Sequence, residues 1–189
     1  MIAQIWTIGH STREIDKFIS ALEANGIKLI ADVRLLPGSK RYPQFNRESL
    51  AESLSEHGIG YEHFPELGGR RKPKPDSRNT AWRNEAFRGY ADHMETEEFR
   101  EGVNRLVHLA TGRVCPVGGL ANKVGPTALM CAEAVWWRCH RALISDFLKA
   151  RGVEVMHILH AQKTQAHPYT SAARIVNGEL SYASNDVLL

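Results

Sequence analysis

Polar and apolar positions alternate along the chain in blocks that predict strands and helices in turn. Apolar runs of strand length occur at residues 4–8, 28–33, 59–64, 127–130 and 153–159. Between these runs, apolar residues recur at the three- and four-residue spacing that is typical of amphipathic helices. Strands that alternate with helices favour a parallel sheet. We therefore expect an α/β fold of three layers, in which a mainly parallel β-sheet is flanked by helices.

The expected helices begin at recognisable signals. Ser11 and Glu14 have the spacing of a capping box, so the first helix is expected to begin there. Asn46 and Thr96 are expected to cap two later helices. A further helix is expected to begin near Arg138, where helical periodicity resumes after the strand at residues 127–130.

The whole chain, residues 1–189, is expected to form one domain. Residues 65–80 are too polar and too rich in glycine and proline to pack, so they are expected to form a basic loop or lid. Residues 113–126 are expected to be a loop insertion before the next strand. The tail at residues 161–189 is expected to carry a β-hairpin, because an Asn-Gly pair at 177–178 suits a type I′ turn.

Composition places the chain among ordinary globular proteins, with 43% hydrophobic and 24% charged residues. No signal peptide is recognisable, and no apolar run approaches the ~18 residues that span a bilayer. The three cysteines are an odd number without the spacing of a disulfide scaffold, which favours a reducing compartment. We therefore expect a cytoplasmic protein with no membrane partner.

The formal net charge of +3 is mild, but its distribution along the chain is uneven. Basic residues gather in two predicted loops, which contain Lys40 and Arg41 in one and Arg70, Arg71 and Lys72 in the other. Cations clustered beside a site suit a nucleic acid or another phosphate-bearing ligand. The alternative is that these loops are simply solvated.

Residues 127–144 are expected to form a strand, a short loop and a helix. In an open α/β sheet, ligands bind where the carboxyl end of a strand faces the amino end of the next helix, and that place favours an anion. Reactive side chains are dense in this segment and at the neighbouring strand ends. The candidates are His10, Ser11, Asp32, Arg34, Cys131, Glu133, Cys139, His140, Arg141 and either His157 or His160.

Four interpretations of this cluster remain open. In the first, Cys131 is a nucleophile whose pKa is lowered by the helix amino end, as in rhodaneses and cysteine phosphatases, although the loop that follows has no glycine. In the second, Glu133 and His10 form an acid–base pair that Asp32 orients. The substrate contacts then come from Ser11, Arg34, Cys139, His140, Arg141 and His157. Trp136 and Trp137 could desolvate the carboxylate, form part of the core or stack on a base.

The third interpretation is a zinc site built from Cys131, Cys139, His140 and a distant His10 or His157, whose spacing matches no common zinc finger or ribbon. Cys139 and His140 are consecutive on the expected helix, so they point about 100° apart and rarely bind the same ion. We therefore predict no cofactor, with zinc as the alternative. In the fourth interpretation, ion pairs among Asp32, Arg34 and Arg141, together with buried hydrogen bonds, simply hold the strand ends of a non-catalytic binding module together.

Several motifs, taken in order, resemble the family named domain of unknown function 488 over nearly the whole chain. They are Thr7-Ile8-Gly9-His10-Ser11, Asp32-Val33-Arg34 followed by Pro37 and Ser39, Leu67-Gly68-Gly69, Tyr90 and Met94, Cys131-Ala132-Glu133, Cys139-His140-Arg141, His167-Pro168 and Asn177-Gly178. The resemblance implies an α/β domain in which the GHS, DVR, CAE and CHR segments line one pocket. It implies no reaction, and residues 115–126 look inserted relative to the family.

From these observations we expect an enzyme that acts on a phosphate-containing substrate, a nucleotide or a nucleic acid, by acid–base hydrolysis. Cys131-dependent transfer and non-catalytic nucleic-acid binding are the alternatives. The sequence leaves the oligomeric state open.

Overall fold

The computed structural model describes residues 3–111 and 125–184. The predicted insertion at 113–126 therefore lies almost entirely outside the described residues. Within the described ranges, no helix is long and apolar enough to span a bilayer.

A six-stranded sheet forms the centre of the molecule, with the strand order β3-β2-β4-β1-β5-β6. The strands are β1 Gln4–Gly9, β2 Leu29–Asp32, β3 Gly60–His63, β4 Thr127–Cys131, β5 Glu154–His160 and β6 Lys163–Ala166. All neighbouring strands in this sheet are parallel except β5 and β6, which form an antiparallel pair. The prediction of a mainly parallel sheet is confirmed.

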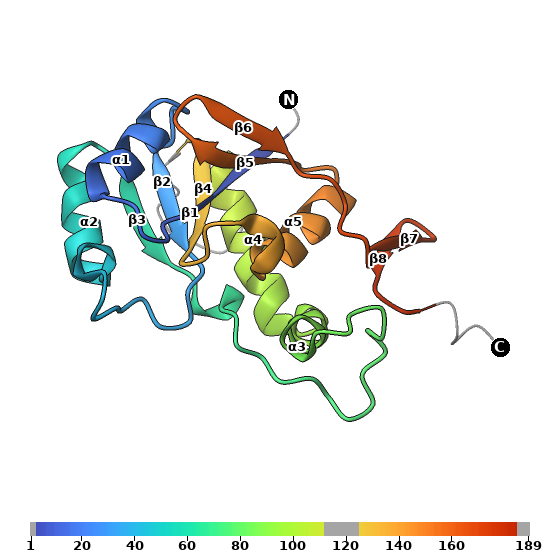
Figure 1. The fold of residues 1–189 in the computed structure, drawn as a ribbon. Helices are drawn as coiled ribbons and strands as arrows, with labels where there is room; N and C mark the ends of the chain where they lie inside the picture. Colours follow the sequence, from blue (N-terminus) through green and yellow to red (C-terminus); the bar gives the residue numbers. More distant parts are fainter. Residues whose placement is uncertain (1–2, 112–124, 185–189) are drawn as a thin grey trace.

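Helices cover both faces of this sheet, as Figure 1 shows. They are α1 Ile15–Glu23, α2 Arg47–Glu56, α3 Glu85–Met94, α4 Glu97–Thr111 and α5 Arg141–Ala150, with short 3-10 turns η1 Pro43–Phe45, η2 Pro65–Leu67 and η3 Trp136–Arg138. Helices α1 and α2 lie on one face, and α4 and α5 lie on the other with α3 beyond them. The three-layer α/β architecture is therefore confirmed.

Alternation along β4 decides which layer each of its side chains enters. Ala128 and Met130 pack in the core beneath α1 and α2, whereas Leu129 and Cys131 pack in the core beneath α4 and α5. Cys131 is thus directed toward the layer that contains α5. This places its thiol near the residues that precede that helix.

The predicted start of the first helix is wrong by several residues. Helix α1 begins at Ile15, and Glu14 occupies the N-cap position without a side-chain hydrogen bond. Ser11 instead lies in a turn with a positive φ of 47°. The capping-box spacing failed because the backbone of Ser11 is bonded to the loop after β4, where its N–H donates to the Ala132 carbonyl.

The predicted starts of three other helices agree with the structure to different degrees. Helix α5 begins at Arg141 rather than near Arg138, because residues 136–138 form the separate turn η3. Thr96 precedes α4, and its hydroxyl accepts a hydrogen bond from the Phe99 N–H, as expected of a cap. Asn46 occupies the N-cap position of α2, but its side chain accepts a bond from the Ser39 N–H instead.

The tail contains one expected and one unexpected feature. The predicted hairpin is confirmed as β7 Arg174–Val176 and β8 Glu179–Ser181, with positive φ at Asn177 and Gly178. Strand β6 was not predicted, because its sequence KTQA has no apolar alternation. It completes the sheet as an antiparallel edge.

Candidate functional site

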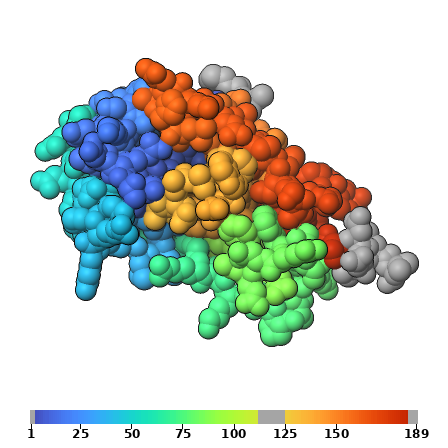
Figure 2. All heavy atoms as spheres, in the orientation of Figure 1, coloured from blue at the N-terminus to red at the C-terminus, as the bar shows by residue number. Residues whose placement is uncertain are grey.

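A cavity of about 610 Å³ opens at the carboxyl ends of β1, β2 and β4. In Figure 2 the segments that border it, from the blue, light-blue, green and yellow-orange parts of the chain, meet on the visible face. Among the predicted site residues, it is lined by His10, Ser11, Arg34, Arg41, Arg70, Cys131, Glu133, Cys139 and His140. Asp32, Arg141 and His157 do not line it and are buried behind its wall.

Asp32 holds Arg34 in place at the end of β2. The carboxylate of Asp32 is fully buried and accepts bonds from Nε and Nη2 of Arg34 at 2.6–3.1 Å. It also accepts the Tyr61 hydroxyl at 2.6 Å. These bonds occupy the carboxylate, so Asp32 orients Arg34 and is not presented to a substrate.

His10 is held as a neutral imidazole at the end of β1. Its Nδ1 donates to the carbonyl of Ser11 at 3.0 Å, and Nη1 of Arg34 donates to its Nε2 at 3.3 Å. Burial, followed by the positive charge of Arg34, lowers the pKa of His10 to about 4. The ring stacks on Phe45 with centroids 4.2 Å apart. His10 therefore lines the cavity with both ring nitrogens already bonded.

The turn after β1 packs tightly against the loop after β4. The N–H of His10 donates to the Cys131 carbonyl at 3.0 Å, and that of Ser11 donates to the Ala132 carbonyl at 2.9 Å. A Cβ at position 9 would collide with the Glu133 carbonyl, so only glycine allows this approach. The predicted convergence of the GHS and CAE segments follows from these contacts.

Two thiols and an imidazole form the floor of the cavity. The ligand atoms of Cys131, Cys139 and His140 all lie within 4.8 Å of one another. Burial alone raises the pKa of the Cys139 thiol, but the hydrogen bond from Cys131 and the nearby His140 and Arg141 hold that pKa well below its usual range. The hydrogen bond to Cys139, followed by burial, raises the pKa of Cys131. The expectation of a lowered pKa at Cys131 is therefore wrong, because Cys139 is the thiol beside the amino end of α5.

The premise that Cys139 and His140 lie on a helix is also wrong. Cys139 has extended backbone, with φ −128° and ψ 148°, and His140 is the N-cap of α5. Their side chains can therefore approach each other, and Cys139 Sγ lies 3.7 Å from His140 Nδ1. The other ring nitrogen, Nε2, donates to the Val33 carbonyl at 3.0 Å.

Arg141 is buried behind this site, with 1% of its surface exposed, and its guanidinium bonds to the surrounding loop. Its Nη2 donates to the Glu133 carbonyl at 2.5 Å, and its Nε donates to Cys139 Sγ at 3.3 Å. Its Nη1 reaches the Thr7 hydroxyl at 3.5 Å. Arg141 therefore fixes the loop after β4, whereas Arg138, which precedes it in η3, is exposed and lines the cavity.

His157 belongs to a separate buried cluster on the far side of Arg141. Its Nδ1 accepts the Thr7 hydroxyl at 2.7 Å, and its Nε2 donates to His167 at 2.9 Å. Trp136 stacks on its ring with centroids 4.4 Å apart, so Trp136 is a core residue, while Trp137 is exposed. His160, the alternative, is exposed at the end of β5.

The two basic loops contribute unequally to the cavity. Arg41 and Arg70 line it, whereas Lys40 and Lys72 are exposed elsewhere. Arg71 turns back onto its own segment and donates to the Gly68 carbonyl at 3.1 Å.

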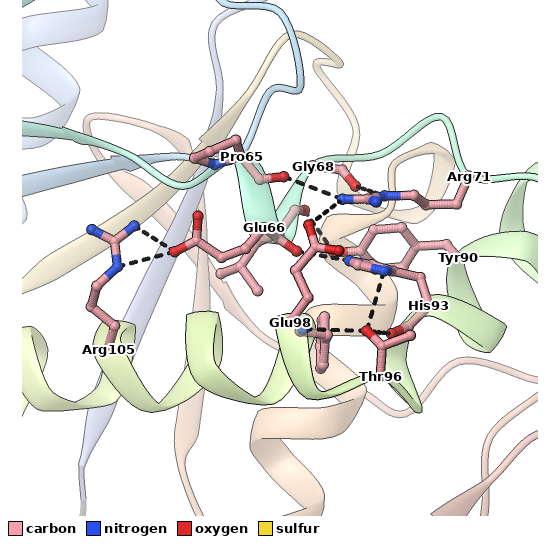
Figure 3. Close-up of polar contacts among 11 residues, drawn as sticks. Pro65, Glu66, Gly68, Arg71, Tyr90, His93, Thr96, Glu98 and Arg105 are labelled. Carbon is pink, nitrogen blue, oxygen red and sulfur yellow. Dashed lines mark hydrogen bonds and ion pairs between the residues drawn. The ribbon is translucent and has the colours of Figure 1, made fainter.

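The segment at residues 65–80 contributes Gly69 and Arg70 to the cavity lining and is anchored to α3 and α4. Figure 3 shows Arg105 bonded to Glu66, with Nη2 and Oε1 2.6 Å apart, and His93 bonded to the Glu66 carbonyl at 2.7 Å. Asp92 on α3 holds the other half of the segment by accepting the N–H of Lys74 and the side chains of Ser77 and Asn79. These bonds hold Gly69 in front of His140, where a Cβ would lie 2.8 Å from Nδ1.

A family model described as domain of unknown function DUF488 matches residues 14–148. The chain belongs to the DUF488 family. The matched range includes the DVR, CAE and CHR segments but not His10, Ser11 or His157, so it is shorter than the motifs suggested. Searches of curated proteins and of solved structures found no significant match.

Sequence reasoning missed three parts of the DUF488 site. Arg138 was treated as a helix start, although it lines the cavity. Tyr61, which donates its hydroxyl to Asp32, lies in β3, a strand that was predicted at residues 59–64, but nothing in the sequence marked this tyrosine as part of the site. Gly69 did carry a signal, because the Leu-Gly-Gly motif formed part of the family resemblance, and the close approach to His140 gives that glycine a physical reason.

Proposed function

We propose that this protein is a hydrolase that acts on a phosphate-containing substrate, a nucleotide or a nucleic acid, bound in the cavity at the strand ends. The observation that carries the proposal is the charge around that cavity. Arg34, Arg41, Arg70 and Arg138 line it. Glu133 is the one carboxylate among the described residues that do so.

The cations differ in how free they are to bind a ligand. Arg34 is paired with Asp32, whereas Arg41, Arg70 and Arg138 form no ion pair with any residue of the described ranges. Guanidinium groups bind phosphate in bidentate fashion and retain their charge at any physiological pH. An excess of unpaired arginine on one cavity therefore favours a phosphate.

The rest of the lining suits a nucleobase. Tyr42, Phe87 and Tyr90 line the same cavity, and aromatic faces stack on bases with little sequence preference. The cavity volume of about 610 Å³ lies within the range typical of small-molecule sites.

Glu133 is the acid–base group of the proposed mechanism, because its residue is exposed, lines the cavity and lies on the loop that Arg141 fixes. His10 and Ser11 shape the wall, and Arg34 contributes charge to it. The free thiols of Cys131 and Cys139 suit the reducing, cytoplasmic location that forms part of the proposal.

The test is ligand binding followed by turnover. Nucleoside phosphates, pyrophosphate and short oligonucleotides are expected to raise the melting temperature of the wild-type protein, because a ligand of the native state stabilises it. The double variant Arg41→Ala, Arg70→Ala is expected to lose most of this shift. Arg47→Ala, an exposed arginine of α2 outside the cavity, is the matched control and is expected to keep it.

Turnover then separates an enzyme from a binding module. Glu133→Gln is expected to bind ligand normally and to hydrolyse it roughly 10²–10⁴-fold more slowly. Binding without turnover by the wild-type protein would indicate a nucleic-acid-binding module instead. A shift that is equal in the double variant and in Arg47→Ala would contradict the cavity as the phosphate site.

A further inference from the structure

We propose that Cys131, Cys139 and His140 bind a divalent transition metal ion, with Zn²⁺ as the best match, and leave one coordination position open to the cavity. The inference adds a metal to the floor of the cavity whose function is proposed above, and only the use of the open position depends on that function. Four features of the described residues support it.

The first feature is the spacing of the ligand atoms. Tetrahedral zinc holds sulfur at about 2.3 Å and nitrogen at about 2.0 Å, which places neighbouring ligand atoms roughly 3.5–3.8 Å apart. Cys139 Sγ and His140 Nδ1 are already 3.7 Å apart, and all three ligand atoms lie within 4.8 Å. Small side-chain rotations would therefore close the cluster around one ion.

The second feature is the orientation of the imidazole. The Nε2 of His140 donates to the Val33 carbonyl at 3.0 Å, so Nδ1 is the ring nitrogen that can offer a lone pair to a metal. A bond of this kind to a backbone carbonyl is the usual partner of a metal-binding histidine. Gly69 stands in front of Nδ1, and a Cβ there would crowd the nitrogen at 2.8 Å.

The third feature is the stabilisation of a negative charge on the sulfur of Cys139. The N–H and Nε of Arg141 both face Cys139 Sγ, at 3.5 Å and 3.3 Å. Such N–H···S bonds stabilise a thiolate, the form that binds metal. The cation also offsets the negative charge that thiolates bring into a buried site, where Arg141 itself is 1% exposed.

The fourth feature is the open side of the cluster. Within the described ranges, the cluster contains no further His, Cys, Asp or Glu ligand, and all three of its residues line the cavity. Three protein ligands and an open position are typical of catalytic zinc, whereas structural zinc is closed by four. Under the proposed function, the open position would hold water or a substrate oxygen.

The experiment is cobalt binding by the metal-depleted full chain. A Cys115→Ser background leaves Cys131 and Cys139 as the only thiols. One Co²⁺ per chain is expected, with a thiolate-to-cobalt charge-transfer band and the visible bands of a tetrahedral ion. Zn²⁺ is expected to displace it and abolish the spectrum, because zinc binds sulfur and nitrogen ligands as a tetrahedral ion without visible bands.

Variants locate the ion. Cys131→Ser, Cys139→Ser and His140→Asn are each expected to weaken cobalt binding and to alter the band, while circular dichroism checks that they are folded. Gly69→Ala, which leaves every ligand in place, is expected to weaken binding roughly 10–100-fold by displacing the His140 ring. His160→Asn, an exposed histidine at the end of β5, is the matched control and is expected to change nothing.

The outcomes separate this inference from the proposed function. No charge-transfer band, or equal affinity in His140→Asn and His160→Asn, would overturn the metal site even if phosphate ligands bind. A tetrahedral cobalt spectrum that requires all three residues supports it even if no phosphate ester is hydrolysed, since the spectrum needs no substrate.

Discussion

Two buried clusters of polar side chains lie on either side of Arg141, and they differ in how completely their atoms are bonded. One is the cavity floor of Cys131, Cys139 and His140. The other, here called the histidine relay, consists of Thr7, His157, His167 and Asp146. Both clusters connect strand ends to α5. In each of them, the neighbours of the histidine side chains are buried from solvent.

In the histidine relay every hydrogen-bonding position of the rings is used. Asp146 accepts from His167 Nε2 at 3.0 Å, so His167 Nδ1 must accept from His157 Nε2. His157 Nδ1 then accepts from the Thr7 hydroxyl. The hydrogen bonds therefore all have the same donor-to-acceptor direction, from the guanidinium of Arg141 to the carboxylate of Asp146. No ring nitrogen is left for a ligand.

The cavity floor is different because His140 Nδ1 has only a sulfur contact, at 3.7 Å. A saturated cluster stabilises the fold, whereas a cluster with a free lone pair facing a cavity can bind a ligand. Residue type alone does not separate the two. Their hydrogen-bond partners do, and this comparison predicts opposite responses to mutation.

The largest effect on stability is expected from Asp146→Ala in the histidine relay. Asp146 accepts bonds from His167, from the N–H and hydroxyl of Thr170 and from the Tyr182 hydroxyl, so it anchors the tail to α5. Removing one partner of a buried charged network typically costs about 3–5 kcal/mol. Urea unfolding measures the loss.

The exposed Asp76→Ala is the matched control for that variant and is expected to stay within about 0.5 kcal/mol of wild type. Cobalt binding at the cavity floor is expected to survive Asp146→Ala under conditions where the variant is folded. A loss below about 1 kcal/mol would show that the relay is not a stabilising unit.

A smaller effect is expected from pH, through His157. Burial first, then the neighbouring His167 and Arg141, which oppose a positive charge on the ring, lower its pKa from 6.5 to about 2. Below pH 6.5 the unfolded chain binds a proton that the folded chain does not, so the free energy of unfolding falls as pH falls toward 2. At about 1.4 kcal/mol per pH unit, His157 accounts for roughly 2 kcal/mol between pH 6.5 and pH 5.

Urea unfolding at the two pH values checks this prediction. His157→Gln is expected to be less stable at pH 6.5 but to lose less stability on acidification than wild type. His160→Gln, which alters an exposed histidine on the same strand, is expected to keep the wild-type pH dependence. Identical pH dependence in wild type and His157→Gln would refute the assignment.

The parts of this comparison that the sequence could predict are those that depend on local pattern. Apolar runs located β1, β2, β4 and β5, and parallel strands bring their carboxyl ends to one edge, so the grouping of His10, Arg34 and Cys131 followed. Strand β6 could not be found, because the sequence KTQA is largely exposed on an edge and lacks alternation.

The roles of individual residues at the strand ends depend on tertiary contacts. Helix α5 begins at Arg141 because residues 136–138 form their own turn, in which Trp136 stacks on His157 from another strand. That shift moves Cys139 off the helix and beside its amino end. It also buries Arg141 and exposes Arg138, and no spacing rule distinguishes these two arginines in advance.

The smallest effect on stability, and the sharpest contrast with the histidine relay, is expected from Arg138→Ala. Arg138 is exposed, lines the cavity and forms no ion pair within the described part of the chain, so its removal is expected to change the free energy of unfolding by less than about 0.5 kcal/mol. The same variant is expected to weaken pyrophosphate binding roughly 10–100-fold, because a hydrogen bond to a charged group contributes about 1.5–3 kcal/mol. Calorimetric titration against Arg83→Ala, an exposed arginine outside the cavity, measures the difference. If Arg138→Ala destabilised the protein and left pyrophosphate binding unchanged, Arg138 would have a structural role, as the residues of the histidine relay do. The proposed difference between the cavity and the histidine relay would then be wrong.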